Sequence, residues 1–178
     1  MASDSDALQP VNSFAPVEPT SCRLLILGSM PGKASLAATE YYAHPRNAFW
    51  PIMAELLGFD PKADYRLRTQ ALQEAGIGLW DVMQSCLRPS SLDSDILETS
   101  IIPNDFPGWF QRHPHTHTVL CNGGKAFQSY QRHVRPLLDE PFRQLPLYQL
   151  PSTSPAHASL TLQQKRLEWH KIMEEFLS

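Results

Sequence analysis

The sequence predicts an α/β fold in which helices cover both faces of a parallel sheet. Four apolar runs of strand length, at residues 23–28, 77–82, 118–121 and 145–150, alternate with segments of helical periodicity. The connections between them are short, and the first run is continuously apolar, which is typical of a strand buried on both faces. We therefore expect a three-layer α/β/α sandwich with a central four-stranded parallel sheet.

The helices expected in the first half of the chain follow the strand at 23–28. A helical pattern covers residues 48–57, and its Pro51 is compatible with the first turn only, because proline lacks the N–H that later turns need. A second amphipathic helix is expected over residues 65–75, and Gly76 closes it before the next strand.

The second half of the chain repeats this alternation. A short helix is expected over residues 104–112, and a second one over 125–133 after the glycine pair that follows the third strand. The last helix has the clearest start, because Thr161 and Gln164 have the spacing of a capping box. Its apolar stripe consists of Trp169, Ile172, Met173, Phe176 and Leu177.

Length and composition indicate one soluble domain. The chain has 178 residues, of which 42% are hydrophobic and 19% charged. Residues 1–21 carry three acids and no base, so we expect a flexible N-terminal tail that docks loosely through Phe14 and Val17, followed by a single domain over residues 22–178. The net charge of −3 then lies in the tail, and the neutral remainder neither favours nor excludes DNA as a partner. The 16 Pro against 8 Gly predict stiff loops.

Metal sites, export and membrane insertion are not expected. The three cysteines lie far apart and the seven histidines lack paired spacing, so neither zinc nor an iron–sulfur cluster is predicted, and no cofactor is expected. The first residues lack the basic and apolar regions of a signal peptide, and no apolar run is long enough to cross a bilayer. We expect buried thiols and a cytoplasmic location, near the nucleoid if the host is a bacterium.

Ligands of such folds bind beyond the carboxyl ends of the strands, where residues 28–47, 122–125 and 151–157 fall. The turn Gly28-Ser29-Met30-Pro31-Gly32 allows backbone N–H groups to approach a ligand, although it matches neither a Walker loop nor a dinucleotide fingerprint. Asn122-Gly123-Gly124 after the third strand is also compatible with a simple turn.

Two segments are rich in residues that bind nucleic acids. Residues 41–50 combine four aromatic side chains with a histidine, Arg46 and Asn47, so bases could stack there and Arg46 could contact phosphate. The alternatives are a core position for Trp50 and a helix-capping role for Asn47. Residues 150–158 place small hydroxylated side chains between prolines, which suits phosphate binding and equally suits a plain loop.

Together these segments resemble the uracil-DNA glycosylase superfamily, and within it the hypoxanthine-DNA glycosylase branch (family 6). The resemblance rests on Gly28 to Gly32, residues 41–50, Asn122-Gly123 and residues 150–155, and it extends to Gly78-Leu79-Trp80-Asp81-Val82 and Asn104-Asp105-Phe106. It implies a compact α/β/α sandwich and a monofunctional glycosylase that cuts the N-glycosidic bond of a deaminated base, most of all hypoxanthine.

The resemblance also implies roles for individual residues. Asn47 falls on the catalytic polar position, Tyr42 on the aromatic that stacks on the flipped base, and Asn122 on the amide that reads it. Ser29 and Met30, in the turn beside the base, are also expected to bind it. The DNA-backbone and intercalation contacts are expected from Arg46, Ser152, Thr153, Ser154, Pro155 and His157.

Two departures from the superfamily pattern affect the expected substrate. The first motif usually contains an Asp or Asn where this chain has Met30, so no carboxylate is available there to activate water. The second motif usually contains a His or Asn where this chain has Leu150, which cannot donate to a uracil carbonyl. Both changes are shared with the hypoxanthine branch.

The expected partner is double-stranded DNA containing a deaminated base, bound by a monomer. Unpairing costs less for a mismatched base, which favours deoxyinosine as the lesion. The alternatives are a glycosylase of broader specificity for uracil, xanthine or mismatched bases, and a catalytically weak lesion-binding protein of the same fold.

Overall fold

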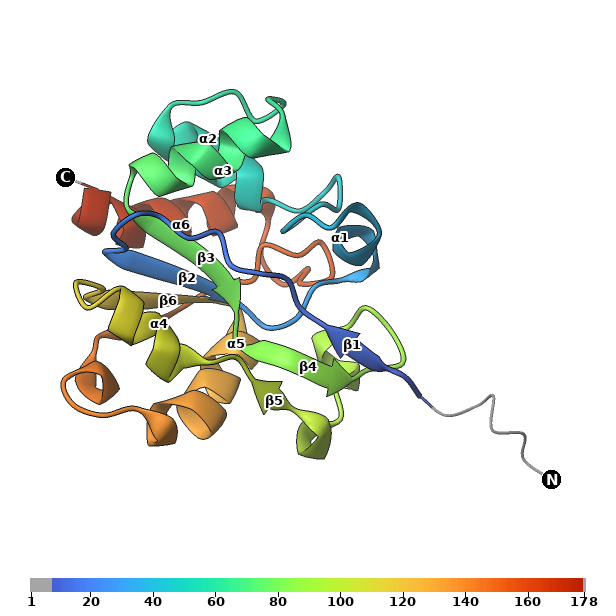
Figure 1. Cartoon of the computed structure of the whole chain (residues 1–178). Coiled ribbons are helices and arrows are strands. Elements are labelled where there is room, and N and C mark those ends of the chain that lie inside the picture. The colour runs from blue at the N-terminus through green and yellow to red at the C-terminus, as the bar shows by residue number, and fades with distance from the viewer. Residues whose placement is uncertain (1–7, 178) are drawn as a thin grey trace.

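The computed structural model describes residues 8–177, and its centre is a parallel sheet with the strand order β3-β2-β6-β7 (Figure 1). The predicted four-stranded sheet is therefore confirmed. Its strands are β2 (Leu24–Gly28), β3 (Ile77–Asp81), β6 (Thr118–Asn122) and β7 (Leu147–Leu150).

Helices cover both faces of this sheet (Figure 1). Helices α2 (Phe49–Leu57), α3 (Tyr65–Glu74) and α6 (Leu162–Leu177) pack on one face, and α4 (Phe106–Arg112) and α5 (Gly124–Ser129) pack on the other. Successive strand residues point to opposite faces, so Ile26 joins the apolar cluster of the first face while Leu25 and Leu27 join that of the second. The continuous apolar run of β2 follows from this double burial.

The ends of the helices follow the predicted capping signals. The Thr161 N–H donates to Gln164 Oε1 at 2.8 Å, and the Gln164 N–H donates to Thr161 Oγ1 at 3.1 Å, as a capping box requires. Within the apolar stripe of α6, Trp169 and Met173 are fully buried. Gly58 ends α2 with φ 76°, a left-handed conformation that favours glycine.

Several short elements were not predicted. A second, three-stranded sheet has the order β1-β4-β5, with β1 (Pro10–Asn12), β4 (Met83–Leu87) and β5 (Ile102–Pro103) paired antiparallel. Helix α1 (Lys33–Ala38) follows the Gly28–Gly32 turn. The helix expected over 125–133 continues past α5 as a wider π-helical turn, Tyr130–Val134. Four single 3₁₀ turns lie at Asp93–Asp95, Glu98–Ser100, Arg135–Leu137 and Phe142–Gln144.

The segment expected to be a flexible tail is attached to the domain over its second half. Strand β1 pairs with β4, and Val17 forms a backbone bridge with Leu79 of β3. The Phe14 carbonyl accepts a hydrogen bond from Trp80 Nε1 at 3.2 Å. Docking through Phe14 and Val17 therefore occurs, and it extends to strand pairing that a short polar sequence does not reveal. Residues 1–7 of the expected tail lie outside the described residues.

The cysteine thiols Cys22, Cys86 and Cys121 are buried and unpaired, as expected from their odd number. No helix in the described part of the chain is long and apolar enough to cross a membrane.

Candidate active site

A cleft of about 730 Å³ opens at the carboxyl ends of the parallel strands. All three segments that the sequence placed there contribute to its wall, together with residues 91–94 and Asp81, which the sequence did not single out. This cleft thus lies where the topology of the sheet places a ligand.

The floor of the cleft is formed where β2 and β3 end side by side. Gly28 is paired in register with Asp81, and Tyr42 lies over the same point. A Cβ atom on Gly28 would lie 2.5 Å from Asp81 Oδ1 and 2.8 Å from the Tyr42 hydroxyl oxygen. Among the described residues, neither Asp81 Oδ2 nor the buried Tyr42 hydroxyl has a hydrogen-bond partner. Two polar groups therefore meet at the floor without being satisfied by the protein.

The Asp81 carboxyl group is strongly perturbed. Burial and, to a smaller extent, the neighbouring Asp93 carboxyl raise its pKa to about 7 against the opposing effect of the Arg88 guanidinium. The sequence contained a signal for this group, a carboxylate at the end of an otherwise apolar strand. The Gly28–Gly32 turn lacks a carboxylate of its own, but strand pairing brings the Asp81 carboxyl group beside it.

Replacing Asp81 with asparagine is expected to stabilise the free protein at pH 8. Its folded-state pKa lies above the ordinary value of 3.8, so the folded protein retains a proton that the unfolded chain has lost, and stability falls as the pH rises to about 7. This penalty is on the order of 4 kcal/mol. We expect the melting temperature of Asp81→Asn to exceed that of wild type by about 5 °C or more at pH 8 and to approach it near pH 4. A constant difference across this pH range would contradict a buried, titrating Asp81.

Tyr42 is held in an unusual backbone conformation at the wall of the cleft. Its φ of 56° is left-handed, and its ring packs on Phe49 with centroids 4.3 Å apart and planes at 35°. On either side of it, the Tyr41 N–H donates to the Tyr65 hydroxyl and the Ala43 N–H donates to Ser35 Oγ. These contacts fix a half-exposed aromatic ring beside the cavity.

Asn47 lines the cleft and contacts the start of α2, but the N-cap of that helix is Ala48, so the expected alternative of a helix cap at Asn47 is not met. Its Oδ1 accepts the backbone N–H of Phe49 at 3.0 Å, at the start of α2. Only the amide oxygen can accept, so this bond also fixes the orientation of the side-chain amide. No described residue accepts from Nδ2, which leaves its two hydrogens for a ligand.

Asn122 is largely occupied by the loop at residues 151–157. Its Oδ1 accepts the Thr153 N–H at 2.9 Å, and its Nδ2 donates to Thr153 Oγ1 at 2.9 Å. The Thr153 carbonyl in turn accepts the Ala48 N–H. One Nδ2 hydrogen remains for other partners. The structure therefore places Asn122 at the cleft but uses most of its amide to position the loop.

The same loop is attached to α6. Trp169 Nε1 donates to the Pro151 carbonyl at 2.9 Å, and Lys165 Nζ donates to the Ser154 carbonyl at 2.9 Å. Within the loop, Ser152 Oγ accepts the Ser154 N–H. A segment without regular structure is thereby held rigidly at the mouth of the cleft.

The remaining predicted residues lie around the same cavity with different environments. Ser29 Oγ donates to Asp93 Oδ1 at 2.6 Å. Met30 contributes to the wall but packs with a small apolar cluster made of Met83, Cys86 and Ile96. Arg46 is exposed, Pro155 lines the cleft, and His157 shares a hydrogen bond with Ser159 Oγ.

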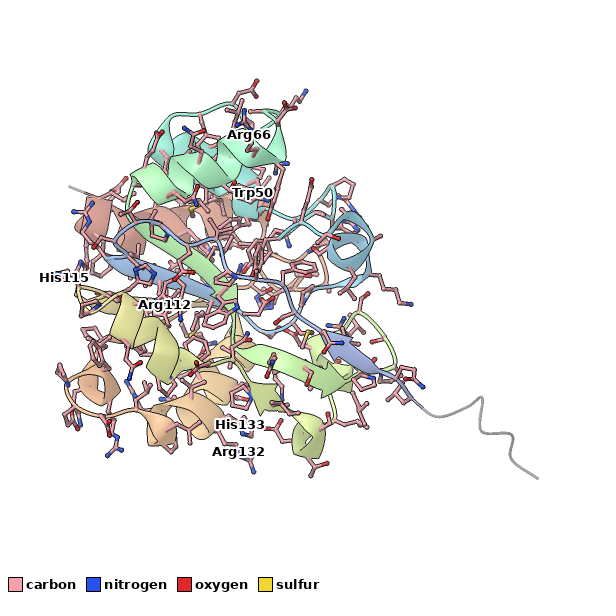
Figure 2. The ribbon with its side chains drawn as sticks, in the orientation of Figure 1. Trp50, Arg66, Arg112, His115, Arg132 and His133 are labelled. Atoms are coloured by element: carbon pink, nitrogen blue, oxygen red, sulfur yellow. The ribbon has the colours of Figure 1, made fainter. Side chains whose placement is uncertain are left out.

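The cations near the cleft are few. Lys125 lines it but pairs with Glu98 at 2.5 Å, which leaves Lys33 and Arg46 as wall cations without an ion pair among the described residues. Other basic side chains, including Arg66, Arg112 and Arg132, lie on other sides of the molecule, away from α1 (Figure 2). Within residues 8–177, no three histidine, cysteine or acidic side chains are placed to hold a metal ion.

Comparisons with known proteins agree with this architecture. A family model described as the uracil DNA glycosylase superfamily matches residues 15–177. Two proteins named hypoxanthine DNA glycosylase are similar over 114 residues, 64% of this chain and 71% of each relative. The one from Methanosarcina barkeri is 37% identical and the one from Methanosarcina acetivorans is 34% identical. A solution NMR structure of a proposed uracil DNA glycosylase from M. acetivorans superposes with a TM-score of 0.77 at 28% identity, covering 94% of this chain and 99% of that one.

Proposed function

Because the chain belongs to the uracil DNA glycosylase superfamily, we propose that it is a monofunctional DNA glycosylase that excises hypoxanthine from deoxyinosine in double-stranded DNA. The observation that carries this proposal is the cleft itself, in which the Tyr42 ring and the free Asn47 amide hydrogens face a cavity at the strand ends. Two relatives above 30% identity bear the name of this activity.

The chemistry requires the target nucleotide to leave the DNA stack. The base then enters the cleft and stacks on Tyr42, while the loop at residues 151–157 contacts the flanking phosphates and fills the space in the duplex. The anchoring of this loop by Asn122 and Trp169 supports that role, because a preordered loop loses little entropy on binding. A monomer is sufficient, since the cleft is built from one chain.

Hydrolysis breaks the bond between C1′ and N9. The electron pair of this bond leaves with the purine, the sugar becomes oxocarbenium-like, and the oxygen of a water molecule bonds to C1′, while the proton that this water loses ends on the departing purine. Asn47 is neutral and cannot take the proton of this water. Its Nδ2 hydrogens can hold the water oxygen in position, because Oδ1 is bound to the Phe49 N–H.

The sequence left open a broader specificity that includes uracil, and the structure disfavours uracil as a substrate. Leu150 is buried in the apolar cluster of the first sheet face, so it offers no donor to a pyrimidine carbonyl. Excision of xanthine remains compatible with this cleft, because xanthine is also a purine that carries a ring N–H.

The activity is tested by alkali-revealed cleavage of duplexes that each contain one inosine, xanthosine, uracil or mismatched thymine. We expect inosine to be cut fastest under single-turnover conditions. Tight binding of the inosine duplex without an abasic product would instead identify a lesion-binding protein. A faster cut at uracil would contradict the hypoxanthine assignment.

The dependence of DNA binding on salt is expected to be shallow. Lys33 and Arg46 are the unpaired cations of the cleft wall, so about two phosphates would be neutralised. The slope of log affinity against log salt concentration is then roughly −2. Fluorescence anisotropy between low and moderate salt measures it, and Arg46→Gln should reduce its magnitude by about one. A slope several times steeper would place the DNA on a different surface.

A further inference from the structure

We propose that Asp81 determines specificity by reading the Watson–Crick edge of the flipped base, accepting a hydrogen bond from the ring N–H that deamination creates. This inference rests on the proposed function of the cleft. It assigns a role to a carboxyl group that the chemistry described above does not use.

Asp81 lies deep in the cleft. A flipped nucleotide stays attached to DNA through its sugar, so N9 remains near the mouth of the cleft and the opposite edge of the purine, with N1 and O6, enters first. Asp81 is 3% exposed and lies at the floor beside Gly28, whereas Arg46 is exposed at the mouth. The edge that reaches Asp81 is therefore the Watson–Crick edge, and C1′ lies away from it.

The part of the chain that the structure describes leaves this carboxyl group unsatisfied. Asp81 Oδ2 is buried without a partner among the described residues. The nearby Arg88 donates to the Pro31 carbonyl at 2.6 Å, and Asn104 donates to the backbone carbonyl of Asp81 rather than to its carboxyl group. An unpaired buried acceptor lowers the free energy of unfolding. Its presence is understandable if a ligand supplies the missing hydrogen bond. Asn122 at the same end of the sheet has only one amide hydrogen left.

The Asp81 carboxylate is complementary to the N1–H group of a deaminated purine. In adenine, N1 is an acceptor; deamination to hypoxanthine turns it into an N–H donor. An ionised carboxylate accepts from N1–H and repels the lone pair of an unmodified adenine N1. One buried acceptor thus separates a deaminated purine from its parent, and a site that leaves a buried polar group unpaired rejects the wrong base strongly.

The protonation state of Asp81 should then control recognition. Asp93 and Arg88 act on it from the segment after β4, and the Tyr42 hydroxyl faces it from the opposite wall. Burial raises the pKa of Tyr42, so this hydroxyl stays neutral. With the pKa of Asp81 raised to about 7, the ionised form that accepts N1–H predominates above pH 7 and is lost below it. An N–H donor stabilises the carboxylate, so binding itself favours ionisation.

The test separates recognition from bond cleavage. Two duplexes carry 2′-fluoroarabino-inosine or 2′-fluoroarabino-adenosine at one position, because fluorine destabilises the oxocarbenium-like state and prevents cleavage. Fluorescence anisotropy at pH 8 gives the inosine-to-adenosine affinity ratio for wild type, for Asp81→Asn and for Asp139→Asn, which removes an exposed carboxylate elsewhere. Asparagine presents a donor as well as an acceptor, so Asp81→Asn should lower the ratio tenfold or more, while Asp139→Asn should leave it unchanged.

A second measurement follows the same affinity ratio as a function of pH in wild type and in Asp81→Asn. The affinity ratio should shrink as the pH falls from 8 to 5.5, because protonated Asp81 no longer rejects adenine. The cleft also contains His44 and His157, so any pH dependence of the ratio that Asp81→Asn retains belongs to other groups.

The outcomes are distinguishable. An affinity ratio that Asp81→Asn preserves, with cleavage alone reduced, overturns base reading and makes Asp81 a participant in the bond-breaking step. A wild-type ratio near one, or one independent of pH, also overturns it. If wild type prefers the inosine duplex but cuts no inosine substrate, the proposed catalytic function fails while base reading by Asp81 stands.

Discussion

Replacing Asn47 with alanine is expected to lower single-turnover cleavage of an inosine duplex by at least tenfold. The substitution removes the two Nδ2 hydrogens that face the cleft, and the loss of one positioned donor at a developing charge typically costs about 10²–10³ in rate. It also removes the oxygen that accepts the Phe49 N–H at the start of α2, at a cost of about 1 kcal/mol in stability. The measurement is the rate of abasic-site formation with enzyme in excess over DNA.

Asn47→Asp separates these two effects. Aspartate keeps an oxygen for the Phe49 N–H, so this hydrogen bond and the thermal stability should be retained, whereas both donor hydrogens are lost. We expect cleavage to fall by at least tenfold in this variant also. Cleavage by Asn47→Asp at the wild-type rate would show that the oxygen rather than the N–H groups matters. An unchanged rate for Asn47→Ala would remove Asn47 from the mechanism altogether.

The layers of the fold could be predicted because they depend on local patterns. Consecutive apolar residues indicate that β2 is buried on both faces, and the spacing of Thr161 and Gln164 indicates where α6 starts. Strands β1, β4 and β5 are short and partly polar, and they exist because they pair with one another. The pairing of such short strands cannot be inferred from the residues within any one of them.

In the site, too, the features that depend on local sequence were predicted and those that depend on long-range contacts were not. The segments that follow the strands were located from the topology alone, and Asn47 and Tyr42, which the resemblance named as candidates, both line the cleft. Asp81 was missed as a site residue because its position depends on a register, the pairing of Gly28 with Asp81 between strands far apart in sequence. The use of the Asn122 amide by Thr153 depends equally on a long-range contact.

Replacing Gly28 with alanine is expected to reduce cleavage of the inosine duplex by about a hundredfold or more. The new Cβ would lie 2.5 Å from Asp81 Oδ1 and 2.8 Å from the Tyr42 hydroxyl oxygen, both shorter than any normal contact of such an atom. Neither group can move away freely, because Asp81 is buried and the Tyr42 ring is packed on Phe49. A shift of about 1 Å in a positioning group can cost a factor of about 10² in rate. Stability should also fall by about 1–3 kcal/mol from overpacking.

Gly32→Ala is the matched control, because it makes the same chemical change in the same turn. A Cβ there would meet only Ser91 Cβ, at 4.0 Å, and the φ of −76° suits any residue. We expect its cleavage rate to stay within about threefold of wild type. Adding Tyr42→Phe to Gly28→Ala removes one of the two clashing oxygens, so it should restore part of the lost stability but not the activity, since the closer contact with Asp81 remains. Equal losses in Gly28→Ala and Gly32→Ala would mean that the turn tolerates no side chain at all, and the crowded floor formed by Asp81 and Tyr42 would then have no special role.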